Sequence, residues 1–329
     1  MADRIFKPLF KNLVQVGMVV SDLCKSMQSY VFYYGFGPMY VLEFNHSNVS
    51  DMYLYGKRQN YSMNLGICPI GDVRFELIEP ISKSIYSDYI NQYGQDIIHH
   101  LKMGVENYWE ALEYLESIGI KIIQSGHQLG DRGKNMYTYL ETRDSLGFII
   151  EVVNVEKDFI KPEPDSWFPE EKNQTPRPVF VRPSQVGIVV KDLKAKIEQY
   201  RELFGLEPWT IKEFNKENTT DMHVYGKEKD YAIKAGFYTL GNVRIKLIEP
   251  LTDSIFSDFY DRYGEGVIHH LGMEIDNYSS VINSLKSIDV EVIQSGCYQD
   301  KIKYSYLATQ SGLNFIVEIY ENNAIPEEM

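Results

Sequence analysis

The sequence has few cysteines and no long apolar run near its start. Cys24, Cys68 and Cys297 are widely spaced, odd in number and without a C-x-x-C pair. This usage argues against a disulfide framework and predicts a reducing, cytoplasmic setting. The first residues, M-A-D-R-I-F-K-P, contain no segment of the kind that a signal peptide or a membrane span needs, so we expect neither.

Positive charge is also scarce. The chain has 33 Lys and Arg against 46 Asp and Glu, a net charge of −13, and no basic block. Nucleic acids and anionic membranes attract basic surfaces, so we expect neither as a partner.

P-loop and dinucleotide-binding fingerprints and a nucleophilic cysteine motif are absent, which excludes several enzyme classes. The composition fits a soluble globular protein, either as a single chain or as a homo-oligomer.

An internal repeat organises the chain. At a constant offset of 170 residues, Q-V-G-M-V-V-S-D-L at 15 returns as Q-V-G-I-V-V-K-D-L, and I-I-H-H-L at 97 returns as V-I-H-H-L. G-D-V-R-F-E-L-I-E-P at 71 returns as G-N-V-R-I-K-L-I-E-P. After residue 127 the offset falls to 167, so the second copy lacks three residues in a loop. Such a match predicts two duplicated domains.

The two copies are joined by a proline-rich segment. Six of the 13 prolines lie there: Pro162, Pro164, Pro169, Pro176, Pro178 and Pro183. Proline interrupts helices and sheets, so we expect a semi-rigid linker over the surface and no regular structure. The predicted organisation is a first domain at 1–155, a linker at 156–182 and a second domain at 183–329.

Each copy reads as an alternation of strands and helices. L-V-Q-V-G-M-V-V predicts a strand, and S-D-L after it begins a helix that ends at glycine. E-N-Y-W-E-A-L-E-Y-L-E-S-I-G predicts a second helix, with Trp109, Leu112, Leu115 and Ile118 on its apolar face. We therefore expect an α+β fold in which each copy holds two βαβββ units, with helices on the outer face of a curved sheet.

Alternation along the strands selects polar residues for a site. His99 would share a packed face with the apolar residues that follow it, held by a local hydrogen bond, whereas His100 would face the other way. Gln15, Glu76 and Glu151 likewise oppose the apolar face of their strands. Polar groups in such surroundings are costly unless they have partners. One polar residue on each of four strands is what a metal site built across a sheet requires.

These motifs resemble the vicinal oxygen chelate superfamily, which includes glyoxalase I, methylmalonyl-CoA epimerase, extradiol dioxygenases and bleomycin-resistance proteins. The likeness is closest in Q-V-G-I-V-V-K-D-L, in F-I-I-E, and in the segment from L-I-E-P at 247 to I-D-N at 277, which resembles the epimerase branch most. The resemblance implies metal ligands on the first, fourth, fifth and eighth strands. In the first copy these positions are Gln15, Glu76, His100 and Glu151.

The second copy departs from this pattern. Its four positions are Gln185, Lys246, His270 and Glu318. A charged lysine has no lone pair to give, so we expect a degenerate site in which Lys246 pairs with Glu318 in place of an ion. Another arrangement would join Gln15 and Glu76 to His270 and Glu318 across the two copies. We favour the set within the first copy.

The resemblance also implies the chemistry. One imidazole and three oxygen donors suit a divalent ion such as Zn²⁺, Ni²⁺, Co²⁺ or Mn²⁺. In the family the ion binds two neighbouring substrate oxygens and stabilises the enediolate that forms when an α-proton leaves. Glu151 could accept that proton if it swings off the metal. Glu43 and Asp51, which the second copy repeats, lie where epimerases carry a base, although a turn or salt bridge explains their repetition equally well.

Three functions follow from these observations. The first is a metal-dependent isomerase, epimerase or lyase acting on a carbonyl or thioester compound, and the 25 tyrosines point to an aromatic or bulky acyl group. The second is a metal-free protein that binds or sequesters a small molecule. The third is a two-domain ring-cleaving dioxygenase, whose iron is held by two His and one Glu. Gln15 and Gln185 leave each copy one His short, which places this function last.

Overall fold

The computed structural model describes residues 7–95 and 97–323. In the first copy the helices are α1 (Leu23–Phe32), α2 (Ile85–Tyr93), α3 (Tyr108–Ser117) and α4 (Arg143–Leu146). Its strands are β1 (Phe10–Val19), β2 (Met39–Phe44), β3 (Val49–Leu54), β4 (Lys57–Arg58), β5 (Met63–Ile70), β6 (Val73–Pro80), β7 (Ile98–Val105), β8 (Ile122–Leu129), β9 (Lys134–Leu140), β10 (Ile149–Val155) and β11 (Ser166–Phe168).

The second copy repeats this order of elements. Its helices are α5 (Leu193–Phe204), α6 (Ile255–Tyr263), α7 (Tyr278–Lys286) and α8 (Gln310–Leu313). Its strands are β12 (Pro183–Val189), β13 (Thr210–Phe214), β14 (Thr219–Val224), β15 (Lys227–Glu228), β16 (Ile233–Leu240), β17 (Val243–Pro250), β18 (Ile268–Met273), β19 (Val292–Tyr298), β20 (Ile302–Leu307) and β21 (Ile316–Tyr320). None of the helices in the described ranges has the length and apolar character that crossing a membrane requires.

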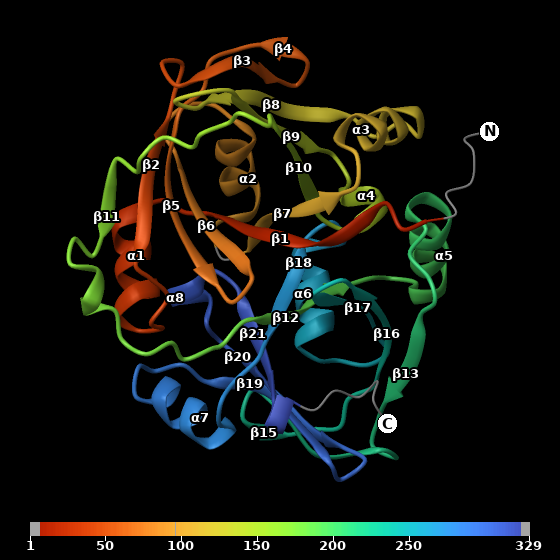
Figure 1. The fold of residues 1–329 in the computed structure, drawn as a ribbon. Helices are drawn as coiled ribbons and strands as arrows, with labels where there is room; N and C mark the ends of the chain where they lie inside the picture. The colour runs from red at the N-terminus through yellow and green to blue at the C-terminus, as the bar shows by residue number, and fades with distance from the viewer. Residues whose placement is uncertain (1–6, 96, 324–329) are drawn as a thin grey trace.

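The strands form two curved mixed sheets, one in each copy (Figure 1). Over the described residues the first sheet has 11 strands in the order β11-β2-β5-β6-β1-β7-β10-β9-β8-β3-β4, and the second has 10 in the order β13-β16-β17-β12-β18-β21-β20-β19-β14-β15. In the first sheet β1 runs parallel to β6 and β10 parallel to β7, while β1 and β7 pair antiparallel. These are two βαβββ units side by side, so the predicted α+β architecture is confirmed.

The outer faces of the two sheets share one core. Val16, Phe75 and Leu101 of the first copy belong to the same cluster of buried residues as Ile188 and Leu247 of the second. Helix α1 also meets α8, and α4 meets α5. Helices α2 and α6, by contrast, lie inside the curve of their own sheets (Figure 1). The concave side of each sheet is therefore enclosed by strands and closed by one helix.

The predicted helices are present, with one difference on α3. An Asn107 side-chain oxygen caps this helix by accepting bonds from backbone N–H groups of its first turn. Its buried residues are Tyr108, Ala111 and Leu115, whereas Trp109 is 59% exposed. The prediction that Trp109 packs into the core is wrong, because the buried face of α3 begins one residue earlier, at Tyr108, whose hydroxyl bonds to Thr138 Oγ1 at 2.6 Å.

The segment between the copies also differs from its prediction. Strand β11 pairs antiparallel with β2 and extends the first sheet by one edge strand. Trp167 of β11 packs edge-on against Tyr40 of β2, with ring centroids 5.9 Å apart. Pro162, Pro164 and Pro169 flank β11 instead of interrupting it, and an edge strand tolerates nearby proline. Part of the linker is thus a wall of the first domain.

Candidate metal centre

A β-bulge on β7 places both histidines of the I-H-H-L motif on the concave side of the sheet. Gly17 of β1 faces His100, but the next residue, Met18, faces Ile98, so His99 is an extra residue on β7. Both imidazoles then contact the ring of Tyr139, at centroid distances of 6.3 Å for His99 and 4.9 Å for His100. The predicted packed-face position of His99 is wrong, because a bulge breaks the strict alternation of a strand.

Gly17 makes room for the His100 ring. A Cβ atom at this position would clash with the His100 imidazole, and Gly187 stands in the same relation to His270. The glycine of the repeated Q-V-G motif is therefore required by a close approach of the ring to the neighbouring backbone.

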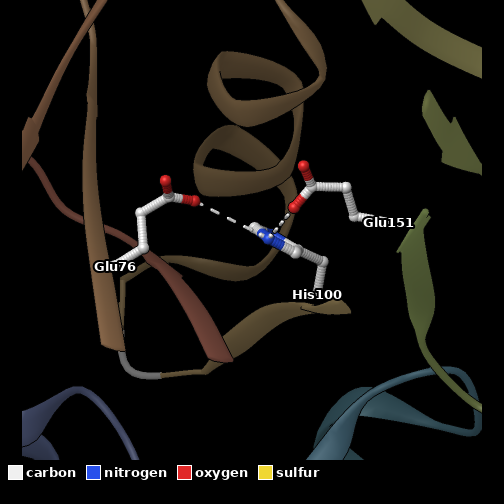
Figure 2. Close-up of side chains that lie close together, drawn as sticks. All are labelled: Glu76, His100 and Glu151. Carbon is white, nitrogen blue, oxygen red and sulfur yellow. Dashed lines mark ion pairs between the residues drawn. The ribbon is translucent and has the colours of Figure 1, made fainter. Parts of the chain in front are cut away.

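Three side chains on different strands converge in front of β7. Glu76 comes from β6, His100 from β7 and Glu151 from β10, and all three are buried. His100 Nε2 lies 3.3 Å from Glu151 Oε2 and 3.8 Å from Glu76 Oε2. Figure 2 shows the two carboxylates pointing at the imidazole from opposite sides. One ligand atom from each residue lies within 4.8 Å of the others, which is the spacing of a metal-binding cluster.

The hydrogen bonding around His100 supports a cation between these atoms. His99 Nδ1 lies 2.9 Å from His100 Nδ1, and burial holds the pKa of His99 well below its usual range, so that ring is neutral. With a hydrogen on His100 Nδ1 donated to His99, His100 Nε2 carries a lone pair. Among the described residues His100 Nε2 and Glu151 Oε2 are buried without a hydrogen-bond partner. Facing acceptor atoms of this kind fit a metal ion.

Gln15 and Lys102 complete the cluster as hydrogen-bond donors. Gln15 Nε2 donates to Glu76 Oε2 at 2.8 Å, so its amide nitrogen, not its oxygen, faces the predicted centre. Lys102 Nζ donates to Gln15 Oε1 at 3.3 Å and lies 3.1 Å from Glu151 Oε1. The four residues predicted for the first copy are therefore brought together, with a lysine among them that the prediction did not include.

The two carboxylates have different electrostatic environments. Burial raises the pKa of Glu76, although Lys102 acts against this rise. Burial acts in the same direction on Glu151, but Lys102 and His100 outweigh it and lower the pKa of Glu151. Glu151 is thus the carboxylate that stays ionised most readily.

A cavity of about 160 Å³ opens in front of this cluster. That volume holds on the order of ten water molecules or a small substrate group. The lining combines Glu76 and Glu151 of the cluster with rings and apolar side chains, among them Tyr40, Tyr86, Tyr137, Tyr139, Ile67 and Val153. The aromatic cavity and the candidate metal centre are thus parts of one site.

The corresponding cluster of the second copy is saturated by hydrogen bonds. Lys246 Nζ lies 2.7 Å from Glu318 Oε1, which also accepts hydrogen bonds from the hydroxyls of Tyr306 and Tyr320. The other oxygen, Oε2, accepts from Gln185 and lies 3.0 Å from His270 Nε2. Both oxygens of the Glu318 carboxylate are thus occupied, and neither is free to bind a metal ion.

Two rings also fill the space in the second copy. Phe237 and Tyr320 stand where the first copy has Ile67 and Val153. The Tyr320 ring lies beside Lys246, and only about 10 Å³ remains between them and the neighbouring rings. At this position, therefore, the described residues of the second copy offer no cluster of unpartnered carboxylate oxygens and leave little room for a ligand.

The other two predicted catalytic residues lie elsewhere. Glu43 and Asp51 are not among the residues that line the cavity. Asp51 instead lies 3.3 Å from His127 and 3.7 Å from Arg58 in ion pairs near the surface, and Glu43 is exposed. In the second copy Glu228 and Cys297 stand in place of Arg58 and His127, so the ion pairs are not repeated. Asp51 and Asp221 both have a left-handed backbone, with φ of 51° and 52°, which agrees with the turn explanation of the repeated aspartate.

The sequence analysis missed Lys102, Arg74, Tyr40 and Lys161, all of which line the cavity. Lys102 could have been found, because it alternates with His100 on one strand and its counterpart in the second copy is Gly272. Lys161 lies on the connecting segment, so the repeat gave no counterpart with which to compare it.

Relatives with known names agree with this architecture. The chain is 29% identical over 116 residues to an ethylmalonyl-CoA/methylmalonyl-CoA epimerase of Cereibacter sphaeroides, covering 35% of this chain and 76% of the relative. It is 26% identical over 121 residues to the mitochondrial methylmalonyl-CoA epimerase of Mus musculus, covering 36% of this chain and 60% of that protein.

A solved structure matches both copies at once. A variant of 4-hydroxymandelate synthase from Streptomyces coelicolor superimposes with a TM-score of 0.61 at 14% identity, over 97% of this chain and 94% of that one. The sequence pattern of the glyoxalase/bleomycin resistance protein/dioxygenase superfamily matches residues 14–139 and again 184–306, more than half of the chain. The chain therefore belongs to this superfamily, with one domain of the family in each copy.

Proposed function

We propose that this protein is a metal-dependent isomerase, epimerase or lyase that moves an α-proton of a carbonyl or thioester substrate. The observation that carries the proposal is the buried cluster of Glu76, His100 and Glu151, two of which, Glu76 and Glu151, line one cavity. The likeness to two epimerases of acyl-CoA compounds supports the same class of reaction.

Glu76, His100 and Glu151 would hold the ion, and Gln15 would join them if its amide oxygen turned inward. When bound, a divalent ion supplies positive charge that stabilises the negative charge developing on substrate oxygens. One imidazole with oxygen donors suits Zn²⁺, Ni²⁺, Co²⁺ or Mn²⁺.

Glu151 is the proposed proton acceptor. Its Oε1 lies 3.1 Å from Lys102 Nζ and its Oε2 lies 3.3 Å from His100 Nε2, so to accept the proton Glu151 would have to move off the ion toward the cavity that it lines. The proton would pass from the substrate's α-carbon to a Glu151 oxygen and return to that carbon or its neighbour, so no co-substrate is consumed. The aromatic lining would exclude water from the proton during this exchange.

A second candidate is a metal-free binding protein, and Lys102 is the observation that favours it. Lys102 already offsets the charge of Glu151, much as Lys246 offsets that of Glu318. A ring-cleaving dioxygenase is less consistent with the cluster, because it contains one imidazole instead of the two expected with iron. Cytoplasmic location and self-association stay predictions.

The test is solvent-proton exchange at the α-carbon. Methylmalonyl-CoA and ethylmalonyl-CoA, incubated in deuterated water with metal-loaded protein, should gain deuterium at that carbon. Glu151→Gln should slow the gain by at least about a hundredfold, the range of a lost general base.

Glu43→Gln and Asp51→Asn provide the comparison. Exchange that survives in both variants and fails in Glu151→Gln, with the metal content of Glu151→Gln equal to that of wild type, supports the assignment of the base. Exchange lost in Glu43→Gln or Asp51→Asn with Glu151→Gln unaffected would return the base to the exposed carboxylates. Binding of the thioesters without exchange would favour the binding protein.

A further inference from the structure

Positive charge gathers around the cavity in an otherwise acidic protein. Arg74, Lys102 and Lys161 line it together with Glu76 and Glu151. Three side-chain cations thus face two carboxylates, and a divalent ion would add two more positive charges. A cleft with this balance attracts an anionic ligand.

Lys161 is held in place by backbone pairing of the segment that joins the two copies. Ile160 N–H donates to the Arg132 carbonyl at 2.8 Å, and Asp131 N–H donates to the Ile160 carbonyl at 2.9 Å. Lys161 follows directly in the chain and lines the cavity, where its Nζ lies 3.7 Å from the centroid of the Tyr40 ring. The ammonium is therefore positioned by two elements of the first domain.

The loop that holds Ile160 is where the two copies differ in length. The offset between the copies falls from 170 to 167 after residue 127, so the β8–β9 hairpin is three residues longer than the β19–β20 hairpin. Its loop, residues 130–133, has four residues against three at 299–301. Asp131 and Arg132, which pair with Ile160, lie in this longer loop. The longer hairpin thus holds the connecting segment at Ile160, next to Lys161.

The electrostatics of Lys161 agree with a place for an anion. Desolvation, and next to it the cation of Arg74, lower the pKa of Lys161 to about 8. Burial raises the pKa of Tyr40, and Arg74 works against that rise, so Arg74 lies near both groups. A bound anion would offset this repulsion between cations.

The second copy offers no equivalent arrangement. Thr210 and Gly272 stand in place of Tyr40 and Lys102, and Arg244, the counterpart of Arg74, is buried. The connecting segment occurs once in the chain. The combination of Arg74, Lys102 and Lys161 thus occurs at the open cavity of the first copy and is not repeated at the filled site of the second.

We propose that Lys161 and Arg74 form a subsite for a carboxylate carried by the substrate, an inference that rests on the proposed function. A guanidinium matches the planar, two-oxygen geometry of a carboxylate. The small cavity behind the subsite suits a short acyl group, with any larger carrier outside it.

The test is the binding of succinate, compared with its neutral analogue succinamide, by isothermal titration calorimetry. Measurements are made on both metal-free and metal-loaded full-length protein, so that the subsite can fail or succeed independently of the metal. Wild type should bind succinate at least about tenfold more tightly than succinamide in both forms. Lys161→Gln should lose about tenfold in succinate affinity, the effect of one charge-assisted bond, and Lys161→Arg should restore most of it.

Lys157→Gln is the matched control, because this exposed lysine lies on the same segment but away from the cavity. It should bind succinate like wild type, and metal content should be equal in all variants. Equal affinity for succinate and succinamide, or equal losses in the Lys161 and Lys157 variants, would overturn the subsite. Tighter binding of inorganic phosphate than of succinate would overturn its assignment to a carboxylate.

Discussion

At the scale of single residues, the position of the His100 ring depends on the absence of a side chain at Gly17. The imidazole occupies the space where a Cβ would stand. The ring cannot retreat easily, since Tyr139 packs edge-on against it at 4.9 Å between centroids. A side chain added at position 17 of β1 should therefore displace His100, a proposed metal ligand.

Gly17→Ala should displace His100 and lower the metal affinity at least about tenfold, with a loss of about 1–3 kcal/mol in the free energy of unfolding from overpacking. Urea unfolding and metal titration measure the two effects. Gly187→Ala should show a similar loss of stability with unchanged metal affinity. Equal metal affinity in wild type and Gly17→Ala would show that this glycine does not position His100.

At the scale of secondary-structure elements, the bulge in β7 determines which face of the sheet His99 and His100 point to. Alternation along the strands correctly placed Glu76 and Glu151 at one site, because β6 and β10 are regular around them. Gln15 also reaches this site, although the pairing of β1 with β7 shifts register between Leu13 and Gln15. It failed for His99, because a bulge depends on the pairing of two strands and leaves little trace in the sequence of one. Lys161 could not be predicted either, since its position depends on the pairing of Ile160 with a loop distant in sequence.

His99→Leu should weaken metal binding about 10- to 100-fold without removing a ligand, because His100 loses the acceptor that orients its ring and fixes its tautomer. Competition with a chelator measures the affinity, and His269→Leu is the control in the second copy. If His99→Leu and His269→Leu bind metal equally well, the contact between neighbouring imidazoles has no part in the site.

At the scale of the whole molecule, the duplication has produced one open and one filled site. The second site is filled by the side chains of Lys246, Phe237 and Tyr320. Its carboxylate, Glu318, forms an ion pair with Lys246. The sequence predicted the loss of a ligand from Lys246, but the filling of the cavity depends on which rings face inward. The second copy contributes the other half of the shared core.

The buried pair of Lys246 and Glu318 predicts a dependence of stability on pH. Burial would raise the pKa of Glu318, but Lys246 and His270 hold it well below its usual range. A lowered folded-state pKa stabilises the protein above the unfolded value of about 4.3, and this stabilisation is lost as the pH falls below it.

Lys246→Met should lower the free energy of unfolding by about 3–5 kcal/mol at pH 7, because it leaves the buried Glu318 carboxylate without the positive charge of its lysine partner. The deficit relative to wild type should shrink toward pH 3, where Glu318 can be protonated in the variant. Urea unfolding at both pH values measures this difference. A deficit that is the same at pH 3 and pH 7 would contradict an electrostatic role for the pair.

The central claim is a metal site within the first copy, and metal stoichiometry in matched histidine variants tests it most directly. Purified protein is reconstituted with Zn²⁺, Ni²⁺, Co²⁺ or Mn²⁺, and the bound metal is measured by mass spectrometry for wild type, His100→Ala and His270→Ala. The structure predicts about one ion per chain in wild type and His270→Ala, and none in His100→Ala. Metal lost in His270→Ala and kept in His100→Ala, or no metal in wild type, would contradict it.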